Sequence, residues 1–292
     1  MLRSGARALR HGVLATAMVL SVCFVVALFS WLSYSDGRAV LSSLTAREVG
    51  EVVSFSDGAV EVRWPSGSAR VPYEDGARFV GRQTQVAFDP ADPARAVIPG
   101  SDLFLETDRA LGGVTFSVAV ALLVVFVGLA RFLLAIRAVR SSSVTVSVRR
   151  IRLQSGLMVR SWLEIDGPTE RWLPVYYDPV LVTLPSPVDV ELRGGRVAVV
   201  DGVTIYPSGR VVTKHPRGRR ADNPAQPDPE TRAPRGLLAQ LRADAVFMVP
   251  APFVGLFWAY LDASGFTGWI TATVIAAVLG LWWGAFRGSD PS

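Results

Sequence analysis

Four stretches of the chain carry no charged residue and are long enough to cross a membrane. They are residues 12–34, 111–130, 245–261 and 263–286. A helix of about 20 apolar residues crosses the roughly 30 Å of hydrocarbon in a bilayer. The pattern therefore predicts four transmembrane helices, the last two forming a tight hairpin. Their expected bounds are 12–34, 111–136, 245–261 and 266–286.

The first stretch has a second interpretation. Arg3, Arg7 and Arg10 precede it, as basic residues precede the apolar core of a cleavable signal peptide. The apolar run continues to Leu32, however, and Val22 is bulkier than the small residue that a lipoprotein cleavage site carries. These two features favour a permanent anchor.

Residues 35–110, between the first two predicted helices, alternate apolar and polar side chains. The stretch GEVVSFSDGAVEVRWPSG alternates on both sides of Asp57-Gly58, a dipeptide that suits a primed two-residue turn because both positions need positive φ. A turn at Ser66-Gly67 and the runs RQTQVAF and ARAVIPG bring the total to about five short strands. A sheet this small needs closure or a partner for its apolar face, so we predict a small barrel or a curled meander.

Residues 141–213 show a second pattern of this kind. Turn dipeptides occur at Ser155-Gly156, Asp166-Gly167, Gly194-Gly195 and Ser208-Gly209. They separate about seven or eight predicted strands. Tyr177-Asp178-Pro179 resembles Phe88-Asp89-Pro90, and this leaves open whether the two β modules are copies of each other.

The segment 214–242 loses all apolar periodicity. Its first part, KHPRGRRADNPAQPDPETRAPRG, contains five prolines. Such a composition is typical of disorder, so we predict a disordered linker that leads into the third helix. Residues 1–11 and 287–292 are then short terminal tails.

Charge is distributed unevenly between the predicted helices. Residues 1–11 hold 3 Arg and no acid, residues 34–112 hold 8 Arg and 12 acids, and residues 131–244 hold 18 basic and 11 acidic residues. Positively charged segments stay on the cytoplasmic side. This rule predicts cytoplasmic termini, a cytoplasmic second β module and a first β module on the outer face of the membrane.

The same asymmetry bears on partners and origin. The net charge of +5 is the sum of segments of opposite sign, which membrane orientation explains without a nucleic-acid partner. Arg outnumbers Lys 29 to 1, and this bias suggests a high-GC bacterial genome, actinobacterial in character. The expected location is therefore the inner membrane of a bacterium.

Asp89-Pro90 and Asp92-Pro93, in the stretch FDPADPARAVIPG, suggest either a metal loop or a turn. Calcium loops carry oxygen ligands at alternate positions, a Gly at the bend and a distal acid, and this stretch has none of these before Gly100. Aspartate before proline commonly starts a turn, because the ring disfavours helix and the carboxylate bonds the downstream backbone. We therefore predict a turn between two strands.

The order of a β hairpin and then VAFDPADPARAVI, bracketed by two predicted transmembrane helices, resembles a family of bacterial membrane domains of unknown function. The resemblance covers residues 47 to 100 and the bracketing helices. It implies a β module between transmembrane helices. It implies no catalytic residue, because the function of the family is itself unsettled.

Catalytic motifs are absent from the sequence. There is no G-x-S-x-G elbow, phosphate loop or dinucleotide fingerprint, and we expect neither an enzyme nor a cofactor. His11 and His215 are far apart in the chain and Cys23 is the one cysteine, which leaves little material for a metal site, a triad or a disulfide.

Basic residues beside the predicted helices are candidates for contacts with lipid headgroups. They are Arg131, Arg137, Arg140, Lys214, Arg217, Arg219 and Arg220. A residue near the end of a span, such as Arg131, extends its charge toward the membrane surface. Gly280 and Gly284 are four residues apart, a spacing that lets two helix backbones approach closely.

The expected fold is therefore four transmembrane helices with two small β-rich modules, one on each side of the membrane. The function favoured by this pattern is a non-enzymatic scaffold or accessory subunit of a cell-envelope complex. It would bind membrane lipids and other membrane or envelope proteins, among them further copies of itself. An accessory role in transport is the alternative, because Pro250 and Pro252 interrupt the third predicted helix as transporter helices are interrupted.

Overall fold

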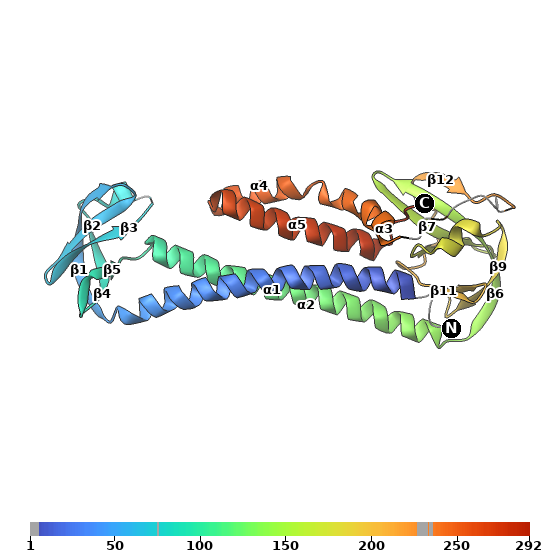
Figure 1. Cartoon of the computed structure of the whole chain (residues 1–292), viewed down its shortest axis with the longest axis horizontal. Coiled ribbons are helices and arrows are strands. Elements are labelled where there is room, and N and C mark those ends of the chain that lie inside the picture. The colour runs from blue at the N-terminus through green and yellow to red at the C-terminus, as the bar shows by residue number, and fades with distance from the viewer. Residues whose placement is uncertain (1–5, 75, 227–232, 234–235) are drawn as a thin grey trace. The chain divides into compact units, whose positions relative to one another are not determined.

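The computed structural model describes residues 6–74, 76–226, 233 and 236–292. Four helical segments are long and apolar enough to span a membrane, as the sequence predicts (Figure 1). The segments are His11–Ser43, Asp102–Val139, Leu237–Asp262 and Gly265–Arg287. The helices extend beyond the uncharged runs because the charged residues that flank these runs also adopt the helical conformation.

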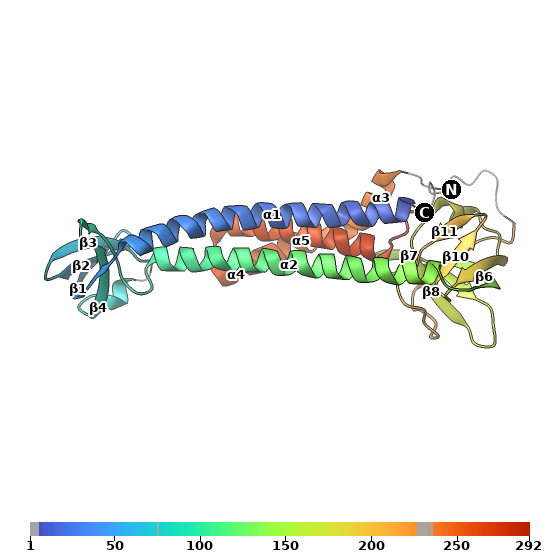
Figure 2. The same ribbon diagram turned by 90° about the horizontal axis from the view of Figure 1, so that it is seen from below.

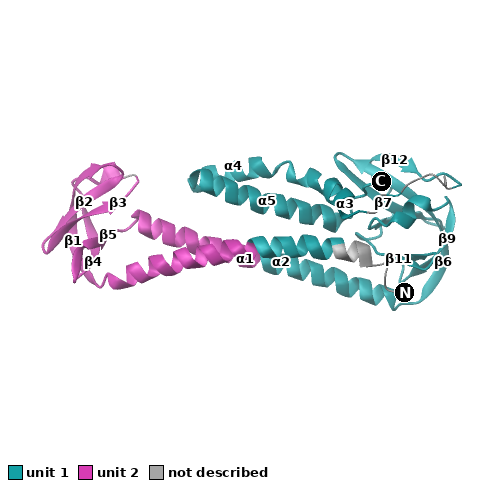
Figure 3. Cartoon of the chain, viewed as in Figure 1, with its two compact units in different colours: residues 1–22, 121–292 teal, residues 23–120 magenta. Residues whose placement is uncertain are grey.

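The chain divides into two compact units (Figure 3). The small unit comprises residues 23–120, and the large unit comprises residues 1–22 with 121–292. Helices α1 (Ala6–Ser43) and α2 (Asp102–Val139) each contribute to both units.

The small unit contains the first β module. Its five strands are β1 (Ala46–Ser56), β2 (Ala59–Trp64), β3 (Gly67–Pro72), β4 (Gln83–Asp89) and β5 (Asp92–Val97). They form one antiparallel sheet in the order β3-β2-β1-β4-β5, and the predicted strand number is confirmed. Asp57 and Gly58 have φ values of 47° and 71°, as the predicted primed turn requires. Val52, Val60, Val62 and Val86 lie in the centre of the core.

The Asp-Pro stretch forms the predicted turn between β4 and β5. Asp89 pairs with Asp92 across the hairpin. The Asp89 carboxylate accepts a hydrogen bond from the backbone N–H of Ala91 at 2.9 Å, and Asp92 accepts one from Ala94 at 3.3 Å. Both carboxylates are therefore engaged with the backbone of their own turn.

The large unit contains the second β module. Its seven strands are β6 (Ser143–Ser155), β7 (Met158–Ile165), β8 (Arg171–Val175), β9 (Val188–Arg193), β10 (Val197–Val200), β11 (Val203–Ile205) and β12 (Arg219–Asp222). The main order is β11-β10-β9-β6-β7-β8, and β12 pairs with β6. Leu163, Ile165, Leu173 and Leu181 are fully buried in its core.

The two β modules share a strand order. Each follows a helix of 38 residues, and in each the first strand is central, with strands two and three on one side and strands four and five on the other. A short 3-10 helix precedes the fourth strand in both, η1 (Gly76–Phe79) and η2 (Pro179–Thr183). This common order supports a repeated unit of a helix and a β module. The matching tripeptides are not equivalent, since Asp89 ends the fourth strand whereas Asp178 caps η2.

The predicted disordered linker is ordered over much of its described length, which corrects that prediction. Strand β12 pairs with residues 151–154 of β6, on the edge that β9 leaves open beyond Val148. His215 packs edge-on against Trp172 with ring centroids 4.6 Å apart. The side chains of β12 are all exposed, so its backbone pairing leaves no apolar pattern in the sequence. Residues 227–232 and 234–235 of the linker lie outside the described residues.

The third candidate span begins earlier than predicted. Helix α3 (Leu237–Asp244) continues through η3 (Ala245–Met248) into α4 (Ala251–Asp262). Pro250 precedes α4 directly, so the helix is interrupted where the two prolines indicate. Helix α5 (Gly265–Arg287) returns beside α4, as both views show (Figures 1 and 2).

Candidate functional site

The C-terminal tail is part of the second β module. Gly288 ends α5 in the left-handed conformation with φ 74°, and a Cβ there would lie 2.7 Å from the Cβ of Ser208. The Asp290 N–H then donates to Val159 O at 2.8 Å, and Ser289 bridges to Arg160. The tail thus occupies the edge of β7 before its pairing with β8 begins at Ser161. The short terminal tail predicted for 287–292 is anchored within the fold.

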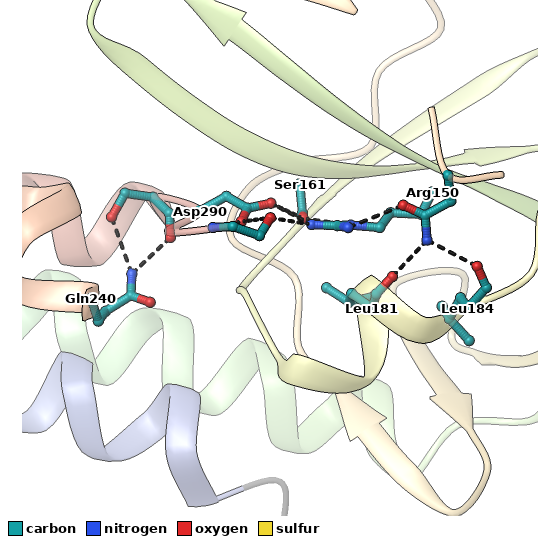
Figure 4. Close-up of polar contacts among 9 residues, drawn as sticks. Arg150, Ser161, Leu181, Leu184, Gln240 and Asp290 are labelled. Carbon is teal, nitrogen blue, oxygen red and sulfur yellow. Dashed lines mark hydrogen bonds and ion pairs between the residues drawn. The ribbon is translucent and has the colours of Figure 1, made fainter. Parts of the chain in front are cut away.

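A tail-binding cluster holds this tail (Figure 4). We use the name for Arg150, Ser161, Asn223 and Asp290. The Arg150 guanidinium pairs with the Asp290 carboxylate at 2.7 Å, and their side chains are 4% and 0% exposed. Ser161 lies between them and donates to Asp290. Because removing charges from water is costly, a pair this buried is stable only when its remaining groups are bonded.

Asn223 extends the tail-binding cluster into the core. Its side-chain oxygen accepts from Arg150 Nη1 at 3.1 Å, and its amide donates to Leu181 O at 2.8 Å and Leu184 O at 2.9 Å (Figure 4). The residue therefore connects the end of β12 with η2. This contact is another reason why the segment after residue 214 is ordered.

A helix-end cluster lies where α1 and α3 meet Ser289 of the tail. It consists of His11, Gln240, Asp244 and Ser289. The His11 ring of α1 contacts the Asp244 carboxylate of α3, and the Ser289 hydroxyl donates to the same carboxylate. Gln240 donates to Ser289 O at 2.7 Å. Asp244 is fully buried, so its carboxyl group is bonded to these neighbours rather than to water.

The arrangement around Asp244 differs from that of a nucleophilic triad. His11 and Ser289 each bond to Asp244, and no hydrogen bond joins His11 to Ser289 among the described contacts. A serine nucleophile needs a base within hydrogen-bond reach. The helix-end cluster is therefore suited to fastening α1, α3 and the tail together.

An arginine cluster, defined as Arg131, Arg160 and Arg287, lies around Tyr176 and Ser208. Arg131 of α2 donates to Tyr176 Oη and Ser208 O, each at 3.1 Å, and to Phe286 O at the end of α5. Arg160 of β7 donates to Ser208 Oγ at 3.1 Å. Helices α2 and α5 are thereby tied to the module.

Titration of the groups outside the helices reflects this crowding. The pKa of Arg160 is lowered to about 10, first by burial and then by the positive charges of Arg287 and Arg131. Burial also raises the pKa of Tyr176, against the opposing effect of Arg131. Both shifts indicate a positively charged region with restricted access to water.

The predicted headgroup-binding residues divide into two groups. Arg131 is held by protein groups, and Arg220 pairs with Asp222 at 2.6 Å and Glu164 at 3.3 Å. The other five are exposed, and headgroup contact stays a prediction for them: Arg137, Arg140, Lys214, Arg217 and Arg219.

Gly280 and Gly284 lie at a close approach between helical segments of this chain. A Cβ on Gly280 would be 2.3 Å from Phe247 O, and a Cβ on Gly284 would be 2.8 Å from Phe247 Cδ2. Both glycines therefore let α5 pack tightly against η3 and the end of α3.

Sequence patterns do not reveal the three clusters. Arg150 and Asp290 are 140 positions apart, and His11 and Asp244 are 233 apart. One signal was available, since Arg150 follows Val146 and Val148 at alternate positions of the strand, on the side that these two apolar residues occupy. A buried Arg at such a position requires an acidic partner, although not a particular one.

The described part of the chain contains no evident metal-binding site. No three His, Cys, Asp or Glu side chains gather there in a group that would hold an ion. The polar contacts of the three clusters are ion pairs and the hydrogen bonds of side-chain amides and guanidinium groups. No protein-family model matches the chain, and no match was found among curated proteins or solved structures.

Proposed function

We propose that the chain crosses the inner membrane of a bacterium four times. It acts as a non-enzymatic scaffold or as an accessory subunit of a cell-envelope complex. The segment between the two β modules contains one candidate span, α2. On this proposal α2 crosses the membrane once, and the two modules lie on opposite faces. The charge balance favours the second module and both termini on the cytoplasmic face, with the first module outside.

The buried ion pair between Arg150 and Asp290 carries this proposal. Together with the arginine cluster, it fixes the second β module to the ends of α2 and α5 through contacts on several sides. A module joined only by a flexible tether would not keep a defined orientation. A module fixed in this way presents its surface to partner proteins at a constant height and angle above the bilayer.

Exposed apolar side chains on the helices fit this role. Leu122, Phe126, Phe253 and Tyr260 are each more than three-fifths exposed, at 65%, 71%, 72% and 82%. Large apolar patches of this kind mark contact with lipid or with other helices. We propose that lipids, partner helices or further copies of the chain cover them.

The scaffold role is tested by purifying the full chain from its native membrane in mild detergent and quantifying the co-purifying proteins by mass spectrometry. The wild type and Asp166→Ala, which removes an exposed carboxylate from the same module, should recover one reproducible set of partners. Asp290→Ala should lose the partners that bind the second module. Recovery of the wild type as a monomer without reproducible partners would contradict the scaffold role.

An accessory role in transport is the second candidate, and one observation favours it. The His11 and Asp244 side chains form a buried ionisable pair between two candidate spans, which is an arrangement found in proton pathways. Proton flux into vesicles containing the purified chain should then fall in His11→Gln and Asp244→Asn. Equal flux in vesicles with and without the protein would rule this role out.

A further inference from the structure

The arginine cluster carries three positive charges. No Asp or Glu in the described residues forms an ion pair with Arg131, Arg160 or Arg287. Arg150, a buried arginine of the same unit, is paired with Asp290, whereas the three arginines of the cluster are partly buried. The cluster therefore lacks the carboxylate that this fold places beside Arg150.

Two of the three guanidinium groups have unused donors. The Nε atoms of Arg160 and Arg287 are buried and form no hydrogen bond in the described structure. Among the described residues the Arg160 guanidinium forms one hydrogen bond, to Ser208, and lies 5.2 Å from the Trp162 ring, and the Arg287 guanidinium lies 4.8 Å from the Trp283 ring. Burying guanidinium donors without acceptors is unfavourable. Nη1 of Arg160 and both Nη atoms of Arg287 also form no hydrogen bond in the described residues and are not fully buried, so the oxygens of an anion can reach them.

The position of the cluster indicates the kind of anion. Arg287 is the last residue of α5, a candidate membrane span, and Trp283 one turn earlier is 46% exposed. Tryptophan is enriched at the boundary between hydrocarbon and headgroups. Phe132 and Leu133, which follow Arg131, are 51% and 59% exposed. Apolar surface beside a cationic cluster matches the two parts of a phospholipid, its acyl chain and its phosphate.

We propose that the arginine cluster binds the phosphate group of an anionic phospholipid. Arg160 and Arg287 donate to the phosphate oxygens, Arg131 adds positive charge while it holds the end of α5, and Trp283 lies beside the acyl chain. Because Arg160 belongs to β7 and Arg287 to α5, one lipid joins the β module to the helical hairpin. The lipid site presupposes the membrane placement proposed above, and it is independent of the partner-binding role.

The site is tested with the full chain purified in detergent and mixed with phosphatidylglycerol or phosphatidylcholine. Native mass spectrometry counts the lipid molecules retained by each chain. The wild type should retain one phosphatidylglycerol in preference to phosphatidylcholine. Changing Arg160→Gln and Arg287→Gln together should weaken retention by about 25-fold, since each cation near a headgroup contributes about fivefold in affinity.

Two further variants act as controls. Arg196→Gln removes an exposed arginine from the turn between β9 and β10 and should retain the lipid as the wild type does. The double change Arg160→Lys with Arg287→Lys keeps both charges and should preserve most of the preference, even if the glutamine variant folds poorly. Equal retention of the two lipids by the wild type, or loss of the preference in Arg196→Gln, would overturn the lipid site.

Inorganic phosphate separates the two sources of a phosphate group. If it raises the melting temperature of the wild type while phosphatidylglycerol is not retained, the site takes a soluble anion and the lipid assignment is wrong. If phosphatidylglycerol remains bound in excess phosphate, the lipid assignment stands. Failure of the chain to co-sediment with membranes would instead contradict the membrane placement itself.

Discussion

Arg150 and Asp290 form an ion pair at 2.7 Å in which neither side chain is more than 4% exposed. The pair joins the first strand of the second β module to the end of the chain. Removing one member leaves the other as a buried, uncompensated charge.

We expect Asp290→Ala to lower the free energy of unfolding by about 3–5 kcal/mol, because the Arg150 guanidinium then remains buried without its partner. Urea denaturation of the full chain in detergent measures this change. Asp166→Ala breaks the 3.8 Å contact between Asp166 and Arg149, whose side chains are 43% and 47% exposed respectively. This change should alter the free energy of unfolding by less than about 1 kcal/mol. Equal effects of the two changes would show that Asp290 is not buried as described.

The close approach at Gly280 makes a second prediction. An alanine Cβ there meets the backbone oxygen of Phe247 at 2.3 Å, so α5 must shift away from η3. Gly280→Ala should destabilise the chain by about 1–3 kcal/mol, the usual range for overpacking. Thermal unfolding in detergent tests it, with Gly128→Ala as the matched control because a Cβ there meets nothing within 4 Å. A melting temperature that Gly280→Ala leaves unchanged or raises would be inconsistent with this packing.

The raised pKa of Tyr176 predicts a pH dependence. Burial keeps the hydroxyl protonated in the folded chain at pH values where the unfolded chain loses the proton. The contribution of the protonated Tyr176 hydroxyl to the free energy of unfolding is therefore present below the pKa of the unfolded chain, about 10. It is lost as the pH rises through the pKa of Tyr176 in the folded chain. Phenolate absorbance of the wild type minus that of Tyr176→Phe should appear only above that ordinary value. A difference signal at or below it would count against the burial of Tyr176.

The Asp-Pro turn predicts insensitivity to calcium. Asp89 and Asp92 bond to the backbone of their own turn, and Asp89→Ala should cost about 1 kcal/mol or less, the value of a local hydrogen bond. Added calcium should leave the melting temperatures of the wild type and Asp89→Ala unchanged. A calcium-dependent rise that Asp89→Ala abolishes would restore the interpretation as a metal loop.

Local chemistry explains which parts of this fold are predictable. Asp57-Gly58 and Gly194-Gly195 turn where the sequence indicates, because positive φ depends on the residues themselves. The four helices that are long and apolar enough to span a membrane follow from uncharged length in the same way. These features need no knowledge of distant contacts.

Contacts between distant residues explain the rest. The polar segment of β12 is ordered because its backbone fills the edge of β6, and the side chains of the strand carry no trace of that pairing. His11, Asp244 and Ser289 meet only after α1, α3 and the tail have assembled. The shared strand order of the two β modules is likewise visible only in the folded chain, since the tripeptides that suggested it occupy different places.

Sidedness is the central claim, because a scaffold that acts on both faces of a membrane requires one β module on each. Cys23→Ser provides a background without cysteine. Ala91→Cys is then placed in the exposed turn between β4 and β5, and Ser155→Cys at the exposed end of β6. A membrane-impermeant maleimide is applied to cells whose outer envelope layers have been made permeable and whose inner membrane is intact. It should label Ala91→Cys at once and Ser155→Cys only after the inner membrane is permeabilised as well. Labelling of both positions in intact cells, or of Ser155→Cys alone, would contradict the account.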